Sequence, residues 1–266
     1  MNGSEFFLKL TDRYERQARL YPALLAGAPL LAVAIGMYGI PLEPESGLVG
    51  LLASFGIIYL LTTIARELGK RMENRLYASW GGKPTTQLLR HRDATLDHVT
   101  KTTYHTFLAA KLKVPFPTPA DEAANAIAAD ATYTSGARWL LDQTRDTSRF
   151  PLLFKELIAY GFRRNCLGLK PIAIAIALLS LLWILGAADV ITAAGFDVDT
   201  LFVLPMHVRV VWAINVVSLI VWIFFISKRT VRTAAFMYAD LLLRACDALN
   251  PSTAFDGETI LKSAGA

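Results

Sequence analysis

Two kinds of residue are scarce in this chain of 266 residues: cysteine and the charged residues. Cys166 and Cys246 are the only cysteines, which excludes a disulfide scaffold, a four-cysteine zinc site and a cysteine-ligated iron–sulfur cluster within one chain. Charged residues make up 18% of the chain and hydrophobic residues 54%, and the mean hydropathy is +0.40. This composition excludes a disordered chain and an ordinary soluble domain, and it predicts a membrane protein.

Four segments are long and apolar enough to cross a bilayer, which takes about 20 residues. They comprise residues 20–40, 47–64, 169–188 and 210–227. Short connections join the first pair and the second pair, whereas residues 65–168 separate the two pairs. The sequence therefore predicts an all-α membrane protein with four transmembrane helices and a domain inserted between the second and the third.

Ionisable residues are absent deep inside these segments, and this excludes the charges that a proton-coupled transporter or a voltage sensor needs. The chain also has no His-Glu-x-x-His zinc motif, no serine elbow and no carboxylate pair inside a segment. The N-terminal stretch lacks the short apolar core and cleavage site of a secretory signal. We therefore expect no cleaved signal, no enzymatic activity and no cofactor.

The basic residues predict the orientation, because cytoplasmic loops are enriched in Lys and Arg. The two short connections contain one of the 27 basic residues, Arg209. They also contain the acidic residues Glu43, Glu45, Asp189, Asp197 and Asp199. Both termini and residues 65–168 are therefore expected on the cytoplasmic side of a bacterial inner membrane.

The predicted domain boundaries follow from these segments. They are a cytoplasmic segment 1–19, a first hairpin 20–64, a helical cytoplasmic domain 65–168, a second hairpin 169–227 and a cytoplasmic helix and tail 228–266. The second span is expected to continue as a stalk to Trp80, and the fourth to about Leu249, in a helix about 60 Å long. Residues 151–165 should form a helix that leads into the third span.

Inside the inserted domain, one helix is expected from Thr85 or Thr86 to about Val114. Its predicted buried face comprises Leu88, Leu89, Leu96, Val99 and Phe107. Another helix should begin at Thr118, with Pro119 next and Asp121 at the third helical position.

His91, His98 and His105 repeat every seven residues along the first of these helices. Successive members would lie about 10.5 Å apart along its axis, so one metal ion could not join two of them in one chain. They are expected to be ordinary surface or interface histidines. The Gly81-Gly82-Lys83-Pro84 stretch lacks the spacing of a phosphate-binding loop and is expected to be a turn.

The fourth span carries the candidate pore residues, Asn215 and Ser218, with the apolar neighbours Val211 and Ile214. A buried Asn must face protein or water, because an unpaired carboxamide in hydrocarbon costs several kcal/mol. Pore lining, with closure by dewetting at the apolar residues, is one interpretation. Hydrogen bonding between helices is the other.

Arginines of the inserted domain are candidate contacts for an anionic ligand, because the guanidinium matches phosphate geometry. The candidate ligand residues are Arg138, Arg145, Arg149, Arg90 and Arg92, with Trp139 available to stack on a base. Arg163 and Arg164 are a juxtamembrane pair, for which anionic lipid or the positive-inside rule is an alternative explanation.

The whole arrangement resembles the small membrane effectors of bacterial antiphage defence, in particular Hailong-type effectors. The resemblance is carried by the span arrangement and by three stretches: Trp80 to Thr85, Thr144 to Asp146 and Tyr160 to Asn165. It implies a homo-oligomeric ion channel whose cytoplasmic domain binds a nucleotide or short oligonucleotide made by a partner nucleotidyltransferase.

Three functions are therefore compatible with the sequence. The first is a homo-oligomeric channel in the lipid bilayer, gated from the cytoplasm. The second is a non-conducting membrane anchor or scaffold whose helical domain recruits a partner protein, and the third is a small transporter.

Overall fold

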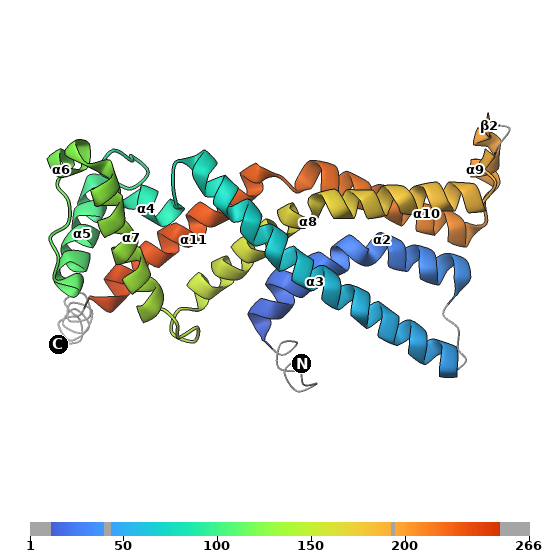
Figure 1. The fold of residues 1–266 in the computed structure, drawn as a ribbon, viewed down its shortest axis with the longest axis horizontal. Helices are drawn as coiled ribbons and strands as arrows, with labels where there is room; N and C mark the ends of the chain where they lie inside the picture. The colour runs from blue at the N-terminus through green and yellow to red at the C-terminus, as the bar shows by residue number, and fades with distance from the viewer. Residues whose placement is uncertain (1–11, 40–43, 193–194, 251–266) are drawn as a thin grey trace, which may run out of the picture. The chain divides into compact units, whose positions relative to one another are not determined.

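A computed structural model describes residues 12–39, 44–192 and 195–250, and this part of the chain is almost entirely helical (Figure 1). The helices before the third predicted span are the π-helical turn η1 (Glu15–Leu20), α2 (Tyr21–Tyr38), α3 (Pro44–Trp80), α4 (Pro84–Leu89), α5 (His98–Leu112), α6 (Pro119–Ala124) and α7 (Ala126–Gln143). Then follow α8 (Pro151–Ala187), α9 (Val198–Val203), α10 (Met206–Ile220), the π-helical turn η2 (Val221–Phe225) and α11 (Lys228–Leu249). Two short strands, β1 (Ile191–Thr192) and β2 (Gly195–Phe196), pair antiparallel between α8 and α9. The all-α prediction is confirmed.

Among the described residues, three helices are long and apolar enough to cross a membrane. They are Glu15–Tyr38, which joins η1 to α2, the long helix α8, and Met206–Phe225, which joins α10 to η2. They contain most of the first, third and fourth predicted spans: the helices end one or two residues before the predicted ends, at Tyr38, Ala187 and Phe225, and Ile40 lies outside the described residues. The predicted second span lies in α3, which is not among the three, so four spans stay a prediction. The structure thus supports a membrane protein.

The chain divides into two compact units. The described residues of the first, called the membrane unit, are 12–39, 44–74, 158–192 and 195–231. Those of the second, called the helical unit, are 75–157 and 232–250. The helical unit is shorter at both ends than the predicted domain 65–168, and α11 contributes to it. Residues 1–11 and 251–266 of the predicted terminal segments lie outside the described residues.

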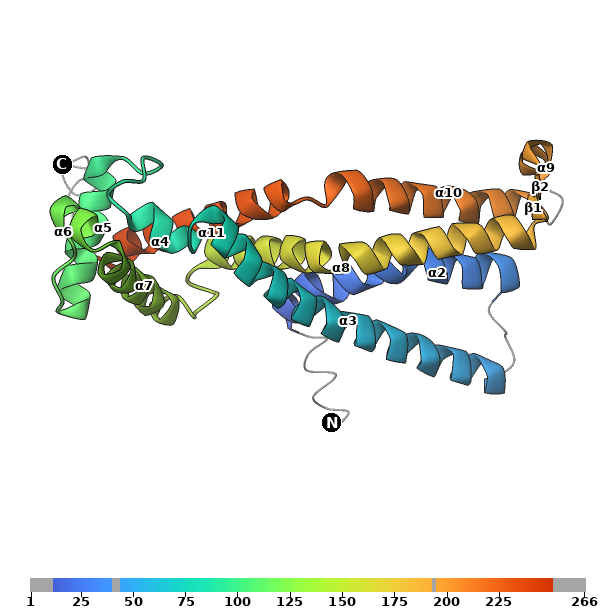
Figure 2. The same ribbon diagram turned by 45° about the horizontal axis from the view of Figure 1, so that its top comes forward.

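In the membrane unit, α2 packs against α10, and the two helices run in opposite directions. Ala26 shares a buried cluster with Trp222, and Gly36 lies against Val211. A methyl group at Gly36 would come within 2.2 Å of the Val211 side chain, so the glycine permits this close approach. α8 runs alongside α10 in both views (Figures 1 and 2).

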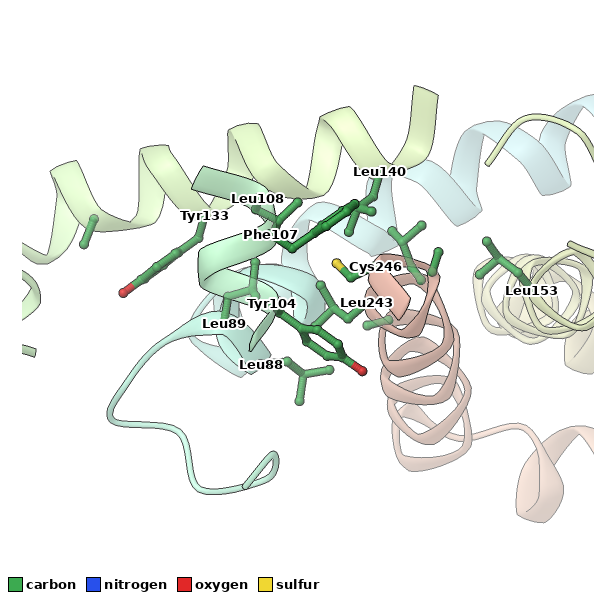
Figure 3. Close-up of a cluster of buried hydrophobic side chains, with 14 residues drawn as sticks. Leu88, Leu89, Tyr104, Phe107, Leu108, Tyr133, Leu140, Leu153, Leu243 and Cys246 are labelled. Atoms are coloured by element: carbon green, nitrogen blue, oxygen red, sulfur yellow. The ribbon is translucent and has the colours of Figure 1, made fainter. Parts of the chain in front are cut away.

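The core of the helical unit is built from α4, α5, α7, the start of α8 and α11 (Figure 3). Its fully buried side chains include Leu89, Leu108, Tyr133, Leu140 and Leu243. Figure 3 shows the side chains of these helices pointing toward one another, with the Cys246 thiol among them. Burial raises the pKa of Cys246 to about 12, so this thiol is protonated and unreactive at neutral pH.

The single helix predicted from Thr85 or Thr86 to Val114 is wrong, because the chain leaves the helix after Leu89 and re-enters it at His98. Asp97 begins α5 as its N-cap, with a carboxylate oxygen 2.9 Å from the Thr100 backbone nitrogen. Val99, predicted in the buried face, is 75% exposed, whereas Leu88, Leu89 and Phe107 are buried and Leu96 packs against the same core. The apolar spacing therefore marks residues that are mostly buried, but they belong to two helices and the loop between them.

The predicted start at Thr118 is confirmed, since Thr118 and Asp121 form a reciprocal capping box. The helix that follows is shorter than expected. Asn125 interrupts it and caps α7, by accepting a hydrogen bond from the Ala128 backbone N–H.

The predicted continuous helix from Val210 to Leu249 is also wrong, because it breaks between η2 and α11. Ile226 has an extended backbone, and the side chain of Ser227 accepts a hydrogen bond from the Thr230 backbone N–H at 3.3 Å. The Lys170 ammonium of α8 donates to two carbonyls at this break, those of Ile223 at 2.9 Å and Ile226 at 2.8 Å. The break is therefore stabilised by a charged side chain from another helix.

Candidate functional sites

The Tyr160-to-Asn165 stretch contributes to a cluster of hydrogen-bonded polar side chains within the membrane unit. The Glu73 carboxylate accepts hydrogen bonds from the Tyr160 hydroxyl at 2.6 Å and from the Arg164 guanidinium at 2.9 Å. The side chains of Arg164 and Glu73 are only 12% and 16% exposed. Arg164 is therefore engaged in an internal ion pair with Glu73. Arg163 is exposed and is the member of the predicted pair that can contact lipid.

Asn165, in the same stretch, lies at a close contact between α3 and α8. Its side-chain nitrogen donates to the Ala18 carbonyl at 2.7 Å. A methyl group at Gly69 would lie 2.2 Å from the Asn165 carboxamide oxygen, and one at Gly168 would lie 2.6 Å from the Gly69 backbone nitrogen. These residues bring two helix backbones into contact, so this part of the resemblance motif has a structural explanation.

The Trp80-to-Thr85 stretch is the predicted turn between α3 and α4. Gly81 and Gly82 have positive φ angles of 85° and 131°, which glycine adopts at little cost. The Gln87 side chain donates to the Gly82 carbonyl at 2.7 Å. A methyl group at Gly82 would come within 2.9 Å of the Arg90 guanidinium.

The separation predicted for the histidines assumed that His91, His98 and His105 lie on one helix, and they do not. His91 lies in the loop after α4, and its ring centre is 4.8 Å from that of His105, so the inferred separation is wrong for this pair. The Nε2 atoms donate to backbone carbonyls, His91 to Pro117 and His105 to Leu89, both at 2.8 Å. Within the described ranges, no group of three or more His, Cys, Asp or Glu side chains could hold a metal ion.

Glu122 organises a buried polar network around these rings. Its carboxylate accepts hydrogen bonds from the His91 backbone N–H at 2.7 Å and the Tyr133 hydroxyl at 2.9 Å, with the Arg92 N–H at 3.4 Å. Burial by itself would raise the pKa of Glu122, but these hydrogen bonds outweigh burial and lower it. For His105, burial is the main cause that lowers the pKa to about 4, so the imidazole is neutral at pH 7.

Lys101 and Arg90 are two cations of the same region, in addition to Arg92. The Lys101 ammonium is buried and donates to the carbonyls of Arg90, at 2.7 Å, and Asp93. Burial lowers the pKa of Lys101, although nearby carboxylates oppose the shift. Arg90 pairs with Asp130 through two hydrogen bonds, of 2.8 and 2.6 Å. The geometry therefore favours a structural role for Arg90 over its predicted role as a ligand contact.

The other predicted ligand residues lie mostly on the surface of the helical unit. Arg92 is 56% exposed at its side chain, and Arg138, Arg145 and Arg149 are exposed as well. Arg145 pairs with Asp142 at 2.6 Å, and Arg149 lies over the Phe150 ring. Trp139 is partly buried, with its ring edge-to-face against Phe107 at 5.8 Å, so it contributes to the core. Ligand binding by these arginines stays a prediction.

The predicted pore residues of α10 do not share one environment. Asn215 is completely buried, and its side-chain nitrogen donates to the Val211 carbonyl of its own helix at 2.9 Å. Its carboxamide oxygen has no hydrogen-bond partner within the described part of the chain. Val211 is buried, Ser218 is half-buried and Ile214 is 43% exposed. The burial of Asn215 agrees with a packed position, but its printed hydrogen bond lies within α10, so the predicted hydrogen bond between helices is not seen among the described residues and both interpretations stay predictions.

Sequence reasoning missed Glu122, Lys101 and Asp130. One signal was present for Lys101, which shares a helical face with Tyr104, His105 and Leu108 at spacings of three, four and seven residues. A solvated lysine is unusual on a helical face that carries large buried residues, so this spacing indicated a buried lysine. Glu122 carried no such signal, because an acidic residue in the first turn of a helix is ordinary.

No family model, no curated protein and no solved structure matches this chain.

Proposed function

We propose that this chain is a homo-oligomeric channel of the bacterial inner membrane, gated when its helical unit binds a nucleotide or short oligonucleotide on the cytoplasmic side. The observation that carries the proposal is the outward face of α3 in the predicted second span. Gly56, Tyr59 and Thr63 are exposed there beside Leu60, which is 57% exposed, and no described atom outside this stretch of the helix would contact a methyl group at Gly56. Small and polar residues on a membrane helix are typical of helix–helix interfaces.

This face favours α3 over α10 as the helix that meets other subunits. The exposed side chains of α10 include Val210, Ile214 and Val217, which suit lipid. By contrast, Thr63 is a polar residue that satisfies its hydroxyl on the Tyr59 carbonyl at 3.1 Å. A ring of α3 helices would therefore place Thr63 and Gly56 at subunit contacts or along a conduit.

The oligomer is tested by Gly56→Leu, measured by native mass spectrometry and by membrane depolarisation in cells. We expect the variant to lose the closed oligomer and the depolarisation together. Val217→Leu, on the exposed face of α10, is the matched control and should keep both. An unchanged oligomer in Gly56→Leu would reject the α3 interface.

Ligand binding is tested by Arg145→Glu with a short oligonucleotide as the probe. We expect weaker binding and a shallower salt dependence, because fewer phosphate contacts release fewer counterions. Lys155→Glu, also exposed in the helical unit, is the control. Unchanged affinity and salt slope would exclude Arg145 and direct the search to Arg92.

Asn215→Leu separates the two interpretations of α10. If α3 forms the conduit, this variant conducts normally and its effect is confined to the stability of the membrane unit. Loss of conduction with intact assembly would instead assign the pore to Asn215 and Ser218.

The predicted orientation has a direct test. A cysteine introduced at Asp197 should react with an impermeant thiol reagent from the periplasm, and one introduced at the exposed Lys111 should not. The opposite labelling pattern would place the helical unit outside.

A non-conducting scaffold is the second candidate, and one observation favours it. The helical unit exposes large apolar side chains that a partner protein could cover, with Ile127 at 85%, Val99 at 75% and Leu152 at 66% exposure. Purified protein that never conducts in planar bilayers, with Ile127→Glu abolishing a cellular interaction, would support the scaffold.

A further inference from the structure

A groove of about 450 Å³ lies between α2 and α8 in the membrane unit. Leu30, Ala34 and Tyr38 line it from α2, and Leu179, Ser180 and Trp183 from α8. Its volume falls in the range of ligand-binding cavities, about 300–1,000 Å³. None of its lining residues is charged.

One end of the groove is closed by a hydrogen bond between two amphipathic side chains. The Trp183 indole nitrogen donates to the Tyr38 hydroxyl oxygen at 2.7 Å, and both residues are more than half exposed. Because the indole supplies a proton to this oxygen, the hydroxyl proton of Tyr38 remains available to another acceptor. Tyr38 is the last residue of α2, and Trp183 lies one turn before the end of α8.

Tyrosine and tryptophan at the ends of membrane helices are typical of the level of the lipid headgroups. The remainder of the groove then lies below this level, at the depth of the hydrocarbon, since both flanking helices are able to cross a membrane. Water would find few polar partners there, and an empty groove would forfeit dispersion contacts. The lipid around these helices therefore supplies an occupant that matches the apolar lining, a hydrocarbon chain.

We propose that this groove binds one acyl chain of a membrane phospholipid, with the Tyr38 hydroxyl donating a hydrogen bond to an ester carbonyl of the same lipid. In the expected orientation the lipid belongs to the outer leaflet. Since the lining has no charge, binding is insensitive to the headgroup. Phosphatidylethanolamine and phosphatidylglycerol should bind with similar affinity. This site does not depend on the proposed channel activity.

The test uses the full chain in a mild detergent, with each of these two lipids added, and native mass spectrometry of the complexes. Ala34→Phe fills the groove and should remove one tightly bound lipid per chain, with at least a tenfold loss of affinity. Ala213→Phe, on the exposed face of α10, adds the same ring outside the groove and should retain the lipid. Trp183→Phe removes the indole donor and should weaken binding several-fold.

Three results would overturn the proposal. One is equal lipid binding by wild type and Ala34→Phe, and another is equal loss of lipid in Ala213→Phe, which would mark general detergent-shell binding. The third is a change in oligomer mass in Ala34→Phe without loss of lipid, which would show that a second copy of the chain occupies the groove. If Ala34→Phe unfolds, Ser180→Leu fills the groove from α8 and is judged by the same three results.

Discussion

The membrane unit and the helical unit reach close packing by different means. In the membrane unit, the tightest approaches are at glycines, where Gly36 meets Val211 and Gly168 meets Gly69. In the helical unit, large side chains such as Tyr133 and Leu140 fill the core, and a buried carboxylate binds the loop after α4. In the membrane unit, glycines thus let a helix backbone approach a side chain at Gly36 and another backbone at Gly168, whereas the core of the helical unit is filled mainly by large side chains.

Lipid around the spans of the membrane unit and water around the helical unit, as proposed above, would favour this difference. In lipid, burial of apolar side chains between helices gains little, so close van der Waals contact decides and small residues permit it. In water, apolar burial drives folding, and a charged group is retained inside only when hydrogen bonds compensate its desolvation. Glu122 satisfies that condition with its backbone and tyrosine donors.

The largest effect is expected when a side chain is added at the contact between Gly168 and Gly69, which would disrupt the close packing of the membrane unit. Gly168→Leu would place atoms against the Gly69 backbone, which cannot rotate away, and should destabilise the membrane unit by about 3 kcal/mol or more. Thermal unfolding in detergent measures the loss. Gly186→Leu, at an exposed glycine with open space around it, should unfold near the wild-type temperature. Equal unfolding temperatures for both variants would show that α3 and α8 separate without cost.

The helical unit should be most sensitive to its buried carboxylate. Glu122→Gln replaces an acceptor by an amide that also presents donors to the N–H groups of His91 and Arg92, at a cost of about 3 kcal/mol. Tyr133→Phe removes one partner only and should cost about 1 kcal/mol. Denaturant unfolding followed by fluorescence compares them. Asp142→Asn, at an exposed ion pair, should change stability by less than about 0.5 kcal/mol, and a comparable loss there would contradict the ranking.

His105 makes the stability of the helical unit depend on pH. Its folded pKa, about 4, lies below the ordinary value of 6.5, so the unfolded chain binds a proton in this interval and the folded chain does not. Stability is therefore complete above pH 6.5 and falls as the pH is lowered, by roughly 2 kcal/mol between pH 7.5 and pH 5. His105→Gln should flatten this dependence in pH-resolved unfolding of the full chain. His98→Gln, at an exposed position, should leave it intact.

The most local effect is expected at the break between η2 and α11. Lys170→Met retains the apolar stem but removes the ammonium from the carbonyls of Ile223 and Ile226, which should cost about 1–2 kcal/mol. Hydrogen exchange of peptides from η2 and the start of α11 should rise locally, while α2 exchange stays constant. Unchanged exchange would mean that Ser227 alone maintains the break.

The helices and several boundaries follow from sequence because their signals are local. Gly81 and Gly82 end α3 as predicted, and Thr118 with Asp121 begins α6 as predicted. The predicted boundaries are wrong where a residue distant in sequence determines the local backbone structure. The loop after Leu89 is stabilised by Glu122, from α6, and the break after Phe225 by Lys170, from α8. The residue spacing within either segment does not indicate such a partner.

The candidate sites divide in the same way. Surface exposure of Arg138, Arg145 and Arg149 follows from their charge, and the structure agrees. The internal roles of Arg90 and Arg164 do not follow from charge, because each depends on a carboxylate from another helix, Asp130 or Glu73. The buried state of Asn215 was one of two outcomes that its carboxamide allowed.

The break before α11 has a consequence for length variation between relatives of this chain. In α8, one inserted residue would rotate everything downstream by about 100°, moving Asn165 and Gly168 away from α3. At Ile226 and Ser227 the backbone is already non-helical, so an insertion there would leave the face that α10 presents to α2 unchanged. We therefore expect natural insertions and deletions to accumulate next to Ser227 and to be absent between Tyr160 and Gly168.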